Sequence, residues 1–380
     1  MDLIYLDHAA STPVSETVLA EMIPVLRETF GNPSEPHAAG RSARAEVVRA
    51  RRRIASLVGA RPQDVVFTGG GTEADNLAVF GRARSRTGAI VTTPVEHPAV
   101  RSAIRALAAE GREVRELPVD RGGLVSLSAL EQALDGEVAL CAVIWANNVT
   151  GTVQPVDAIA SLCRERGVPL HLDAIQAASG LPVTLDGLGG ETTIAIAAHK
   201  LGGPKGVGCL VGSTVSELTP RVLGGGHERG LRSGTENVPG IVGLAAALTE
   251  RRHLLDGGEA GHRAALRDRL EASAGVAVAC VNAPRLPGHA CLLCAGARGD
   301  TLVHLLDAGG VCVAAGSACS SGSPEPSHVL LALGYSAEEA RSLLRVTLGP
   351  ASTAADVDGF LEVFHPALAQ VRELVTAARA

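Results

Sequence analysis

Short apolar runs alternate along most of this chain with segments in which apolar residues recur at helical spacing. Runs of this length without polar alternation are typical of strands buried on both faces. We expect strands over 64–68, 88–93, 138–145, 168–174, 192–198 and 206–212. The helical spacing predicts helices over 74–84, 98–110, 127–134 and 156–166. This alternation favours an α/β fold with a mostly parallel sheet, and we expect seven strands.

The pattern changes after about residue 255. A helix over 259–273 is followed by expected strands over 276–281, 289–295, 311–315 and 343–349, and by a last helix over 354–378. We predict a large α/β domain over 16–254. A smaller α+β domain is predicted from 1–15 and 255–380 together.

Composition narrows the functional classes. Of the 380 residues, 46% are hydrophobic but only 2% aromatic, so an aliphatic core is expected. The net charge is −6 and basic residues are dispersed, which argues against a nucleic-acid surface. We interpret Arg51–Arg53 as the solvated face of a helix. No secretion signal or long apolar span is present, so we expect a cytoplasmic protein without a membrane segment.

The chain has 8 cysteines, most of them in apolar runs where cysteine acts as a small hydrophobe. Cys291 and Cys294 have a spacing that also suits zinc or redox chemistry, but no second pair follows. We interpret them as core residues and expect no metal site. Cys319 differs, because it lies among glycine, serine and alanine in "AAGSACSSGS", which predicts a mobile loop.

A glycine-rich turn, "TGGGTEADN" (68–76), links an expected strand to an expected helix. Gly71 allows close backbone approach, Thr72 offers a hydroxyl, and a helix N-terminus favours an anion. The turn therefore suits a phosphate group. The alternative is an ordinary tight turn with Thr72 as the N-cap.

Asp173 follows a buried strand in "HLDAIQ", at the sheet edge where α/β proteins bind ligands. A carboxylate there can keep a pyridine nitrogen protonated, and Gln176 can reach the same ligand. The alternatives are a helix-capping aspartate, or half of a metal pair with His171.

Lys200 follows another apolar strand, in "AAHKLGGPKG". A lysine in such surroundings can react with a carbonyl group. Lys205 is the competing lysine but lies in an exposed-looking turn. Lys200 could also be an ordinary residue at a strand end.

Three further segments carry polar side chains in suggestive places. His97 precedes a helix and could stack on an aromatic cofactor, or simply mark the boundary. Arg345 interrupts an apolar strand and could bind a carboxylate, or face solvent. The segment 224–237, with Thr235, could bind anions or be a surface loop. Taken together, a phosphate site, a ring-nitrogen partner and a reactive lysine favour pyridoxal 5′-phosphate and an amino-acid substrate.

The chain resembles the cysteine desulfurases of the NifS/IscS type, in the class V aminotransferase superfamily. The resemblance rests on "YLDHAASTPV", "GNPSEPHAAGRSAR", "VFTGGGTEADNLA", "EHPAV", "NNVTGTVQP", "HLDAIQA", "HKLGGPKGVG", "GGGHERGLRSGTEN", "GSACSSGSPEPSHVLLALG" and "LLRVTLG". It runs through nearly the whole chain and implies a homodimer with the fold of type I pyridoxal-phosphate enzymes.

The resemblance also implies residue roles. Lys200 is expected to bind the cofactor covalently, His97 to stack on its ring, Asp173 to hold the ring nitrogen and Gln176 the phenolic oxygen. Lys200 is also expected to carry the Cα proton, and His97 to handle substrate protons. Gly71, Thr72 and His199 are expected at the phosphate, and Thr235 at the phosphate of the partner subunit's cofactor. Asn148 and Arg345 are expected to bind the substrate carboxylate, and Cys319 to be the nucleophile.

The reaction implied is conversion of L-cysteine to L-alanine, with the sulfur left on Cys319 as a persulfide for transfer to a protein acceptor. Iron–sulfur cluster assembly, transfer-RNA thiolation, DNA phosphorothioation and cofactor synthesis all use such donors. Two alternatives stay open: another class V enzyme that needs no thiol, such as an aminotransferase or lyase, and a non-catalytic scaffold for sulfur assembly.

The chain departs from the family pattern at three places. Ala197 stands where relatives usually have a serine that donates to the phosphate, so we expect weaker cofactor retention. Val149 stands where an acidic residue usually follows the paired asparagines. "AAGSACSSG" replaces a more serine-rich version of the cysteine loop. We expect these last two changes to leave the chemistry in place and to bear on the rate or the choice of partner.

Overall fold

The computed structural model describes residues 3–316 and 325–379. Its helices are α1 (Glu16–Glu28), α2 (Ala38–Leu57), α3 (Gly71–Ser85), α4 (Pro98–Ala109), α5 (Leu127–Ala133), α6 (Val156–Glu165), α7 (Val238–Asp256), α8 (Glu259–Ala274), α9 (Gly299–Ala308), α10 (His328–Ala332), α11 (Ala337–Arg341) and α12 (Ala354–Arg379). Its strands are β1 (Ile4–Tyr5), β2 (Val65–Thr68), β3 (Ala89–Thr92), β4 (Val114–Glu116), β5 (Val138–Ile144), β6 (Leu170–Asp173), β7 (Thr192–Ala197), β8 (Gly208–Gly212), β9 (Ala277–Val278), β10 (His289–Leu293), β11 (Val311–Cys312) and β12 (Leu343–Thr347).

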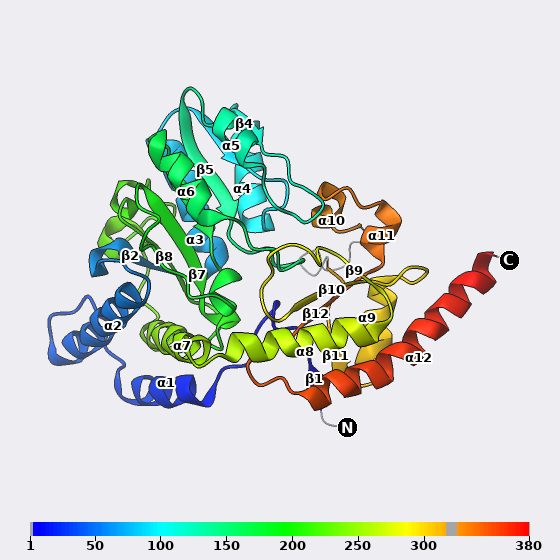
Figure 1. Ribbon diagram of the computed structural model, residues 1–380. Helices are drawn as coiled ribbons and strands as arrows, with labels where there is room; N and C mark the ends of the chain where they lie inside the picture. Colours follow the sequence, from blue (N-terminus) through cyan, green and yellow to red (C-terminus); the bar gives the residue numbers. More distant parts are fainter. Residues whose placement is uncertain (1–2, 317–324, 380) are drawn as a thin grey trace.

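A seven-stranded sheet forms the centre of the larger part of the molecule (Figure 1). Its strand order is β2-β8-β7-β6-β5-β3-β4. The strands from β7 to β4 pair in parallel, whereas β8 pairs antiparallel with both β7 and β2. The prediction of a mostly parallel seven-stranded sheet is therefore confirmed.

Helices cover both faces of this sheet, because successive strand residues point to opposite sides. Val65 and Phe67 of β2 pack in a core with α2, α5, α6 and α7. Val66, between them, packs on the other face against α3. The continuous apolar runs in the sequence reflect this burial on both faces.

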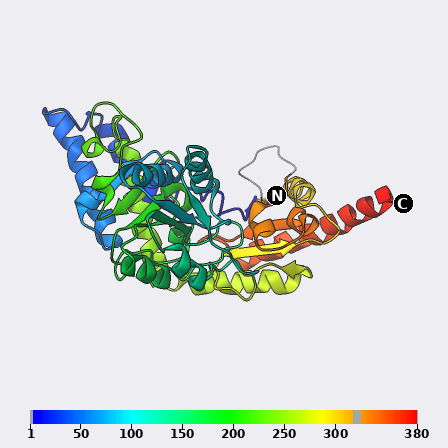
Figure 2. The same ribbon diagram turned by 90° about the horizontal axis from the view of Figure 1, so that it is seen from above.

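A second core lies beside the first (Figures 1 and 2). It is built on β12-β10-β9 and on the parallel pair β1-β11, with α8, α9 and α12 packed around them. Leu6, from the N-terminal segment, is fully buried in this core. The domain boundary at 254/255 stays a prediction, and α7 ends at Asp256, next to it.

Several elements differ from those expected. The edge strand β4 was not predicted, because its sequence VRE is short and polar. The long helices α1 and α7 lie outside the predicted set, and α2 was anticipated only through the helical pattern around Arg51–Arg53. The strand expected over 276–281 is limited to β9, at 277–278.

The interpretation of Arg51–Arg53 as a solvated face is wrong for Arg51. Its guanidinium lies 4.6 Å from the centre of the Phe67 ring and donates to the buried carboxylate of Glu228 from Nη1 at 2.8 Å. Arg51 therefore joins α2 to the segment before α7.

Within the described ranges, none of the helices combines the length and apolarity that crossing a bilayer requires.

Candidate active site

A cavity of about 320 Å³ lies where β6 and β7 end and α3 begins. Nearly all residues predicted for the site line it: Gly71, Thr72, His97, Asn148, Asp173, Gln176, His199, Lys200 and Arg345. Thr235 is exposed and does not line the cavity. Cys319 and residues 317–323 of its predicted mobile loop lie outside the described residues.

Asp173, the last residue of β6, provides a buried carboxylate. Its Oδ1 accepts a hydrogen bond from the backbone N–H of Ile175 at 3.0 Å. Burial raises the pKa of Asp173, while His97 and Lys200 oppose that rise by favouring the charged form. A cationic ring N–H placed in this cavity would favour the charged form further.

Lys200 lies in the short 3₁₀ turn that follows β7. Its Nζ donates to the carbonyl oxygens of Ala9 and Ala10, at 2.6 and 2.8 Å. The N-terminal segment thus holds the amine at the edge of the cavity. Lys205, the competing lysine, is exposed and does not line this cavity.

His97 is the N-cap of α4, and its Nδ1 accepts from the backbone N–H of Ala99 at 3.1 Å. This bond leaves Nε2 as the proton-bearing nitrogen of the neutral ring. A ring nitrogen of His97 lies within 4.8 Å of a carboxylate oxygen of Asp173. His97 therefore both marks the start of α4 and lines the cavity, although the sequence analysis treated these two roles as alternatives.

The part of the cavity lined by the first turn of α3 suits an anion. Gly71 and Thr72 form the first turn of the 15-residue helix α3, and Gly70 rather than Thr72 is its N-cap. A Cβ on Gly71 would collide with the side chain of Ile175. His199 lies nearby, and burial together with the two lysines that follow it lowers its pKa to about 4. Backbone N–H groups, one hydroxyl and one imidazole are thus available to a phosphate.

Gln176 provides the clearest sign that the cavity fits a polar ring. Its Nε2 donates to Ser179 Oγ at 3.2 Å, but its Oε1 is buried without a hydrogen-bond partner among the described residues. Such orphaned atoms are costly. Because the two ends of an amide have the same shape, a flip would instead present the N–H₂ group to a phenolate oxygen. The residues present therefore fit pyridoxal phosphate.

Arg345 faces the cavity from β12, in the other core. Its Nη2 pairs with Asp7 Oδ1 at 2.8 Å and its Nη1 donates to the backbone oxygen of Asn148 at 3.0 Å. Its Nε is buried and has no hydrogen-bond partner within the described part of the chain. Arg345 is buried, so the reading of a solvent-facing arginine is wrong.

One departure from the family pattern lines the cavity and a second lies in an apolar cluster outside it. Ala197, at the end of β7, is buried and lines the cavity near Gly71. Val149 is buried in an apolar cluster with Leu343 and Leu330. A Cβ on Gly316, which precedes the undescribed cysteine loop, would overlap Leu343 and approach Val149 Cγ1 to 3.3 Å.

The other candidates for metal or redox chemistry have structural partners. His171 pairs with Asp75 and Thr193, not with Asp173. Cys291 and Cys294 are free, buried thiols, and burial raises the pKa of Cys294 to about 12. They are core residues, as interpreted from the sequence.

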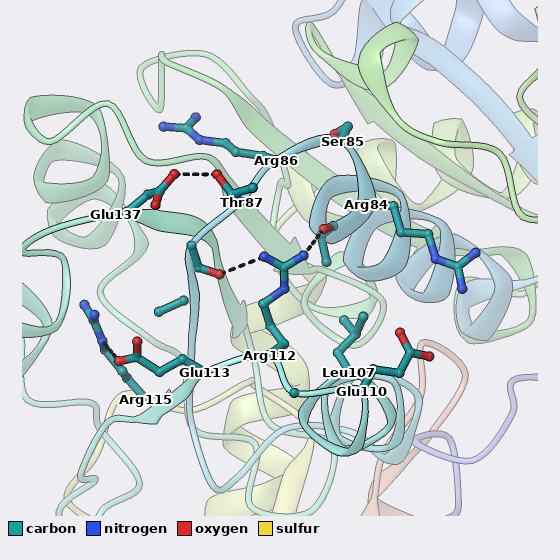
Figure 3. Close-up of a pocket in the computed structure, with 14 residues that line it drawn as sticks. Arg84, Ser85, Arg86, Thr87, Leu107, Glu110, Arg112, Glu113, Arg115 and Glu137 are labelled. Carbon is teal, nitrogen blue, oxygen red and sulfur yellow. Dashed lines mark hydrogen bonds and ion pairs between the residues drawn. The ribbon is translucent and has the colours of Figure 1, made fainter.

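A larger surface hollow, of about 600 Å³, lies at the opposite edge of the sheet (Figure 3). It includes residues at the amino ends of β3 and β5, whereas α/β proteins bind ligands at the carboxyl ends. Arg112 crosses it and donates to the backbone oxygens of Ala83 and Gly88. We therefore place the active site in the smaller cavity.

The sequence reasoning missed several residues of the site. Ala9, Ala10, Ile144 and Ile175 line the cavity without having been singled out. Asp7 was contained in a quoted motif, but no local pattern indicated its pairing with Arg345, 338 positions away.

Comparison with known proteins agrees with this site. The aminotransferase class-V family profile matches residues 4–360. An "IscS-like cysteine desulfurase" of Mycobacterium tuberculosis is 44% identical over 391 aligned positions, covering 99% of each chain. A "cysteine desulfurase" of Cereibacter sphaeroides is 41% identical, covering 98% of each. A solved "NifS-like protein" superposes with a TM-score of 0.88 at 33% identity, covering 98% of this chain and 99% of that one.

Proposed function

The chain belongs to the aminotransferase class-V family and is a cysteine desulfurase, and we propose that it works with bound pyridoxal 5′-phosphate to release L-alanine from L-cysteine. The observation that carries this proposal is the convergence of Lys200, Asp173 and Arg345 on one cavity. These residues supply an amine, a ring-nitrogen partner and a carboxylate partner. When bound there, pyridoxal phosphate withdraws electrons and makes the Cα proton of an amino acid acidic.

Different residues of the cavity bind different parts of the cofactor. Gly71, Thr72 and His199 hold the phosphate, and Gln176 bonds the phenolic oxygen. Thr235, being exposed, is available to a second subunit, as a homodimer requires.

Asp173 keeps a proton on the ring nitrogen, and His97 packs against the ring. Arg345 and the side chain of Asn148 orient the substrate carboxylate. The buried Nε of Arg345 has no partner among the described residues, and Nη1 and Nη2 each keep one further N–H beside their bonds to the Asn148 carbonyl and Asp7, so the guanidinium can still donate to a carboxylate.

Lys200 carries the covalent attachment and then moves the Cα proton as a free amine. For either task its Nζ must leave the carbonyl oxygens of Ala9 and Ala10. Binding of the cofactor therefore breaks the two hydrogen bonds from Lys200 Nζ to the N-terminal segment and replaces them with the covalent attachment.

Cys319 is the proposed nucleophile, on the evidence of its sequence motif. Its thiolate attacks the sulfur of L-cysteine. A sulfur–sulfur bond forms, the Cβ–S bond breaks and its electron pair passes to Cβ, which takes up a proton to give alanine. The persulfide on Cys319 is then available to a protein acceptor, for which iron–sulfur cluster assembly is one destination. We also propose a cytoplasmic location.

The test is to incubate the purified protein with L-cysteine and a reductant and to measure alanine and sulfide, which are expected in equal amounts. Cys319→Ala is expected to retain cofactor absorbance and lose turnover. Cys312→Ala is the matched control, since Cys312 is a partly exposed thiol in β11. Wild-type sulfide release by Cys319→Ala would contradict the assignment and favour a class V enzyme that needs no thiol.

A further inference from the structure

A buried carboxyl group lies directly behind Asp173 and has no part in the mechanism above. Asp75, in the second turn of α3, is fully buried. One of its oxygens lies within 4.8 Å of an Asp173 oxygen, and of a His97 ring nitrogen. Two carboxylates this close and this buried are not both ionised, because neither is solvated and each repels the other.

Asp75 is joined to β6 and β7 by a short chain of hydrogen bonds. Its Oδ1 lies 3.1 Å from Nε2 of His171, and Nδ1 of His171 lies 3.1 Å from Oγ1 of Thr193. The Thr193 hydroxyl is 3.4 Å from the carbonyl oxygen of Leu170. His171 is fully buried, and burial lowers its pKa to about 3, so its ring is neutral.

The second carboxyl oxygen of Asp75 indicates which group is the donor in each hydrogen bond of this chain. Oδ2 is buried without a hydrogen-bond partner in the part of the chain that the structure describes. On a neutral acid this unpartnered oxygen is a carbonyl and costs less than on a carboxylate, where it would leave a buried charge without a donor. A neutral Asp75 donates from Oδ1 to His171 Nε2, His171 donates from Nδ1 to Thr193, and Thr193 donates to Leu170. All three bonds then run in one direction.

The surroundings of Asp173 favour the opposite charge state. Its Oδ1 receives the N–H of Ile175, and His97 and Lys200 lie near enough to favour the carboxylate. His97 lies equally within reach of both carboxylates, but Asp173 also has Lys200 and the N–H of Ile175, whereas the other charged neighbours of Asp75, Asp173 and Glu96, are both acidic. A proton shared between the two aspartates therefore belongs on Asp75.

We propose that Asp75 is a positioning residue that stays protonated against His171, so that the single negative charge of the Asp75–Asp173 pair resides on Asp173. The role of that charge at the ring nitrogen rests on the proposed function. The protonation of Asp75 does not, since the hydrogen-bond chain exists in the protein without cofactor.

The first test is spectroscopic and uses the cofactor-free protein at neutral pH. Infrared spectra are expected to show buried protonated carboxyl groups, and Asp75→Asn is expected to remove one component. Glu96→Gln is the matched control, because burial raises the pKa of Glu96 to about 8 and it should give a separate component. Nitrogen-15 NMR is expected to find the His171 proton on Nδ1. An unchanged carboxyl signal in Asp75→Asn, or a proton on Nε2, would overturn the proposal.

The second test uses the holoenzyme. Asp75→Asn places an amide where the neutral acid was, and its N–H₂ can still donate to His171 Nε2. Cofactor absorbance and kcat/KM are expected to stay within about twofold of the wild type. Asp75→Leu leaves His171 without its donor and is expected to lower cofactor retention, with rescue by asparagine but not by leucine. A tenfold loss of kcat in Asp75→Asn would show that an ionisable group is needed there. The two proposals can fail separately. If Asp173 does not hold the ring nitrogen, Asp173→Asn would leave the cofactor absorbance unaltered, and the infrared evidence for a protonated Asp75 would still stand.

Discussion

Arg345 and Asp7 join the two ends of the chain through a partly buried ion pair, with Nη2 of the buried Arg345 2.8 Å from Oδ1 of Asp7. Nη1 is held as well, by the carbonyl oxygen of Asn148. The guanidinium is therefore fixed before substrate arrives, and a preorganised fork binds a carboxylate with less loss of entropy than a mobile one.

Replacing Arg345 by lysine is expected to raise KM for L-cysteine. The ammonium of lysine cannot contact Asp7, Asn148 and a substrate carboxylate in one planar arrangement. Loss of a charge-assisted bond of about 1.5–3 kcal/mol corresponds to roughly a tenfold to hundredfold increase. Steady-state kinetics with cofactor absorbance as the control measures it. An unchanged KM would remove Arg345 from substrate binding.

Asp7→Ala is expected to lower the free energy of unfolding by about 3 kcal/mol, because it leaves the buried Arg345 charge without its partner. Asp358→Ala is the matched control. It breaks an ion pair with Arg269 in which both side chains are about half exposed, and such pairs contribute about 1 kcal/mol or less. Urea unfolding of both variants measures the difference, and equal losses would argue against a special role for Asp7.

Ala197→Ser is expected to strengthen cofactor retention. Ala197 lines the cavity beside the first turn of α3, so a hydroxyl there adds a donor for the phosphate. A bond of about 1.5–3 kcal/mol predicts a tenfold or larger fall in the dissociation constant. Thr72→Val, which removes a hydroxyl from the same region, should act in the opposite direction. Equilibrium dialysis of both variants tests the idea, which fails if Ala197→Ser leaves the affinity unchanged.

The sequence predicted those residues of the site that lie at or just after the end of an apolar strand. Asp173 ends β6 and Lys200 lies in the short turn after β7, so the parallel sheet brings them together. Side chains that meet through packing gave no such signal. Asp75 and His171 are 96 positions apart, and their contact depends on how α3 lies on the sheet.

Two predictions were wrong because polar residues were taken to be outside strands or exposed to solvent. The strand β4 was missed because an edge strand need not be apolar. Arg51 looked solvated because its partner, Glu228, lies 177 positions away.

The cofactor-free protein is expected to be most stable near pH 6.5. Burial lowers the pKa of His8 and His199 to about 4 and that of His171 to about 3. Below about pH 6.5 the unfolded chain binds protons at these residues that the folded protein does not, so stability falls as the pH falls. Glu96 contributes a pH dependence of stability with the opposite sign, because burial raises its pKa in the folded protein to about 8. Its contribution is present in acid and is lost as the pH rises through 8.

In acid the histidines outweigh the raised acids Glu96, Asp75 and Asp173, and the histidine contribution fades as the pH rises through about 6.5, the pKa of an unfolded histidine, so the maximum lies near that pH and the buried acids dominate above it. Urea unfolding at pH 5, 6.5 and 8 measures this curve. Glu96→Gln removes one proton that only the folded protein retains, and is expected to flatten the decline above pH 6.5 by up to about 1.4 kcal/mol per pH unit. Stability that rises from pH 6.5 to 8, or a decline that Glu96→Gln leaves unaltered, would mean that Glu96 is ionised in the folded protein.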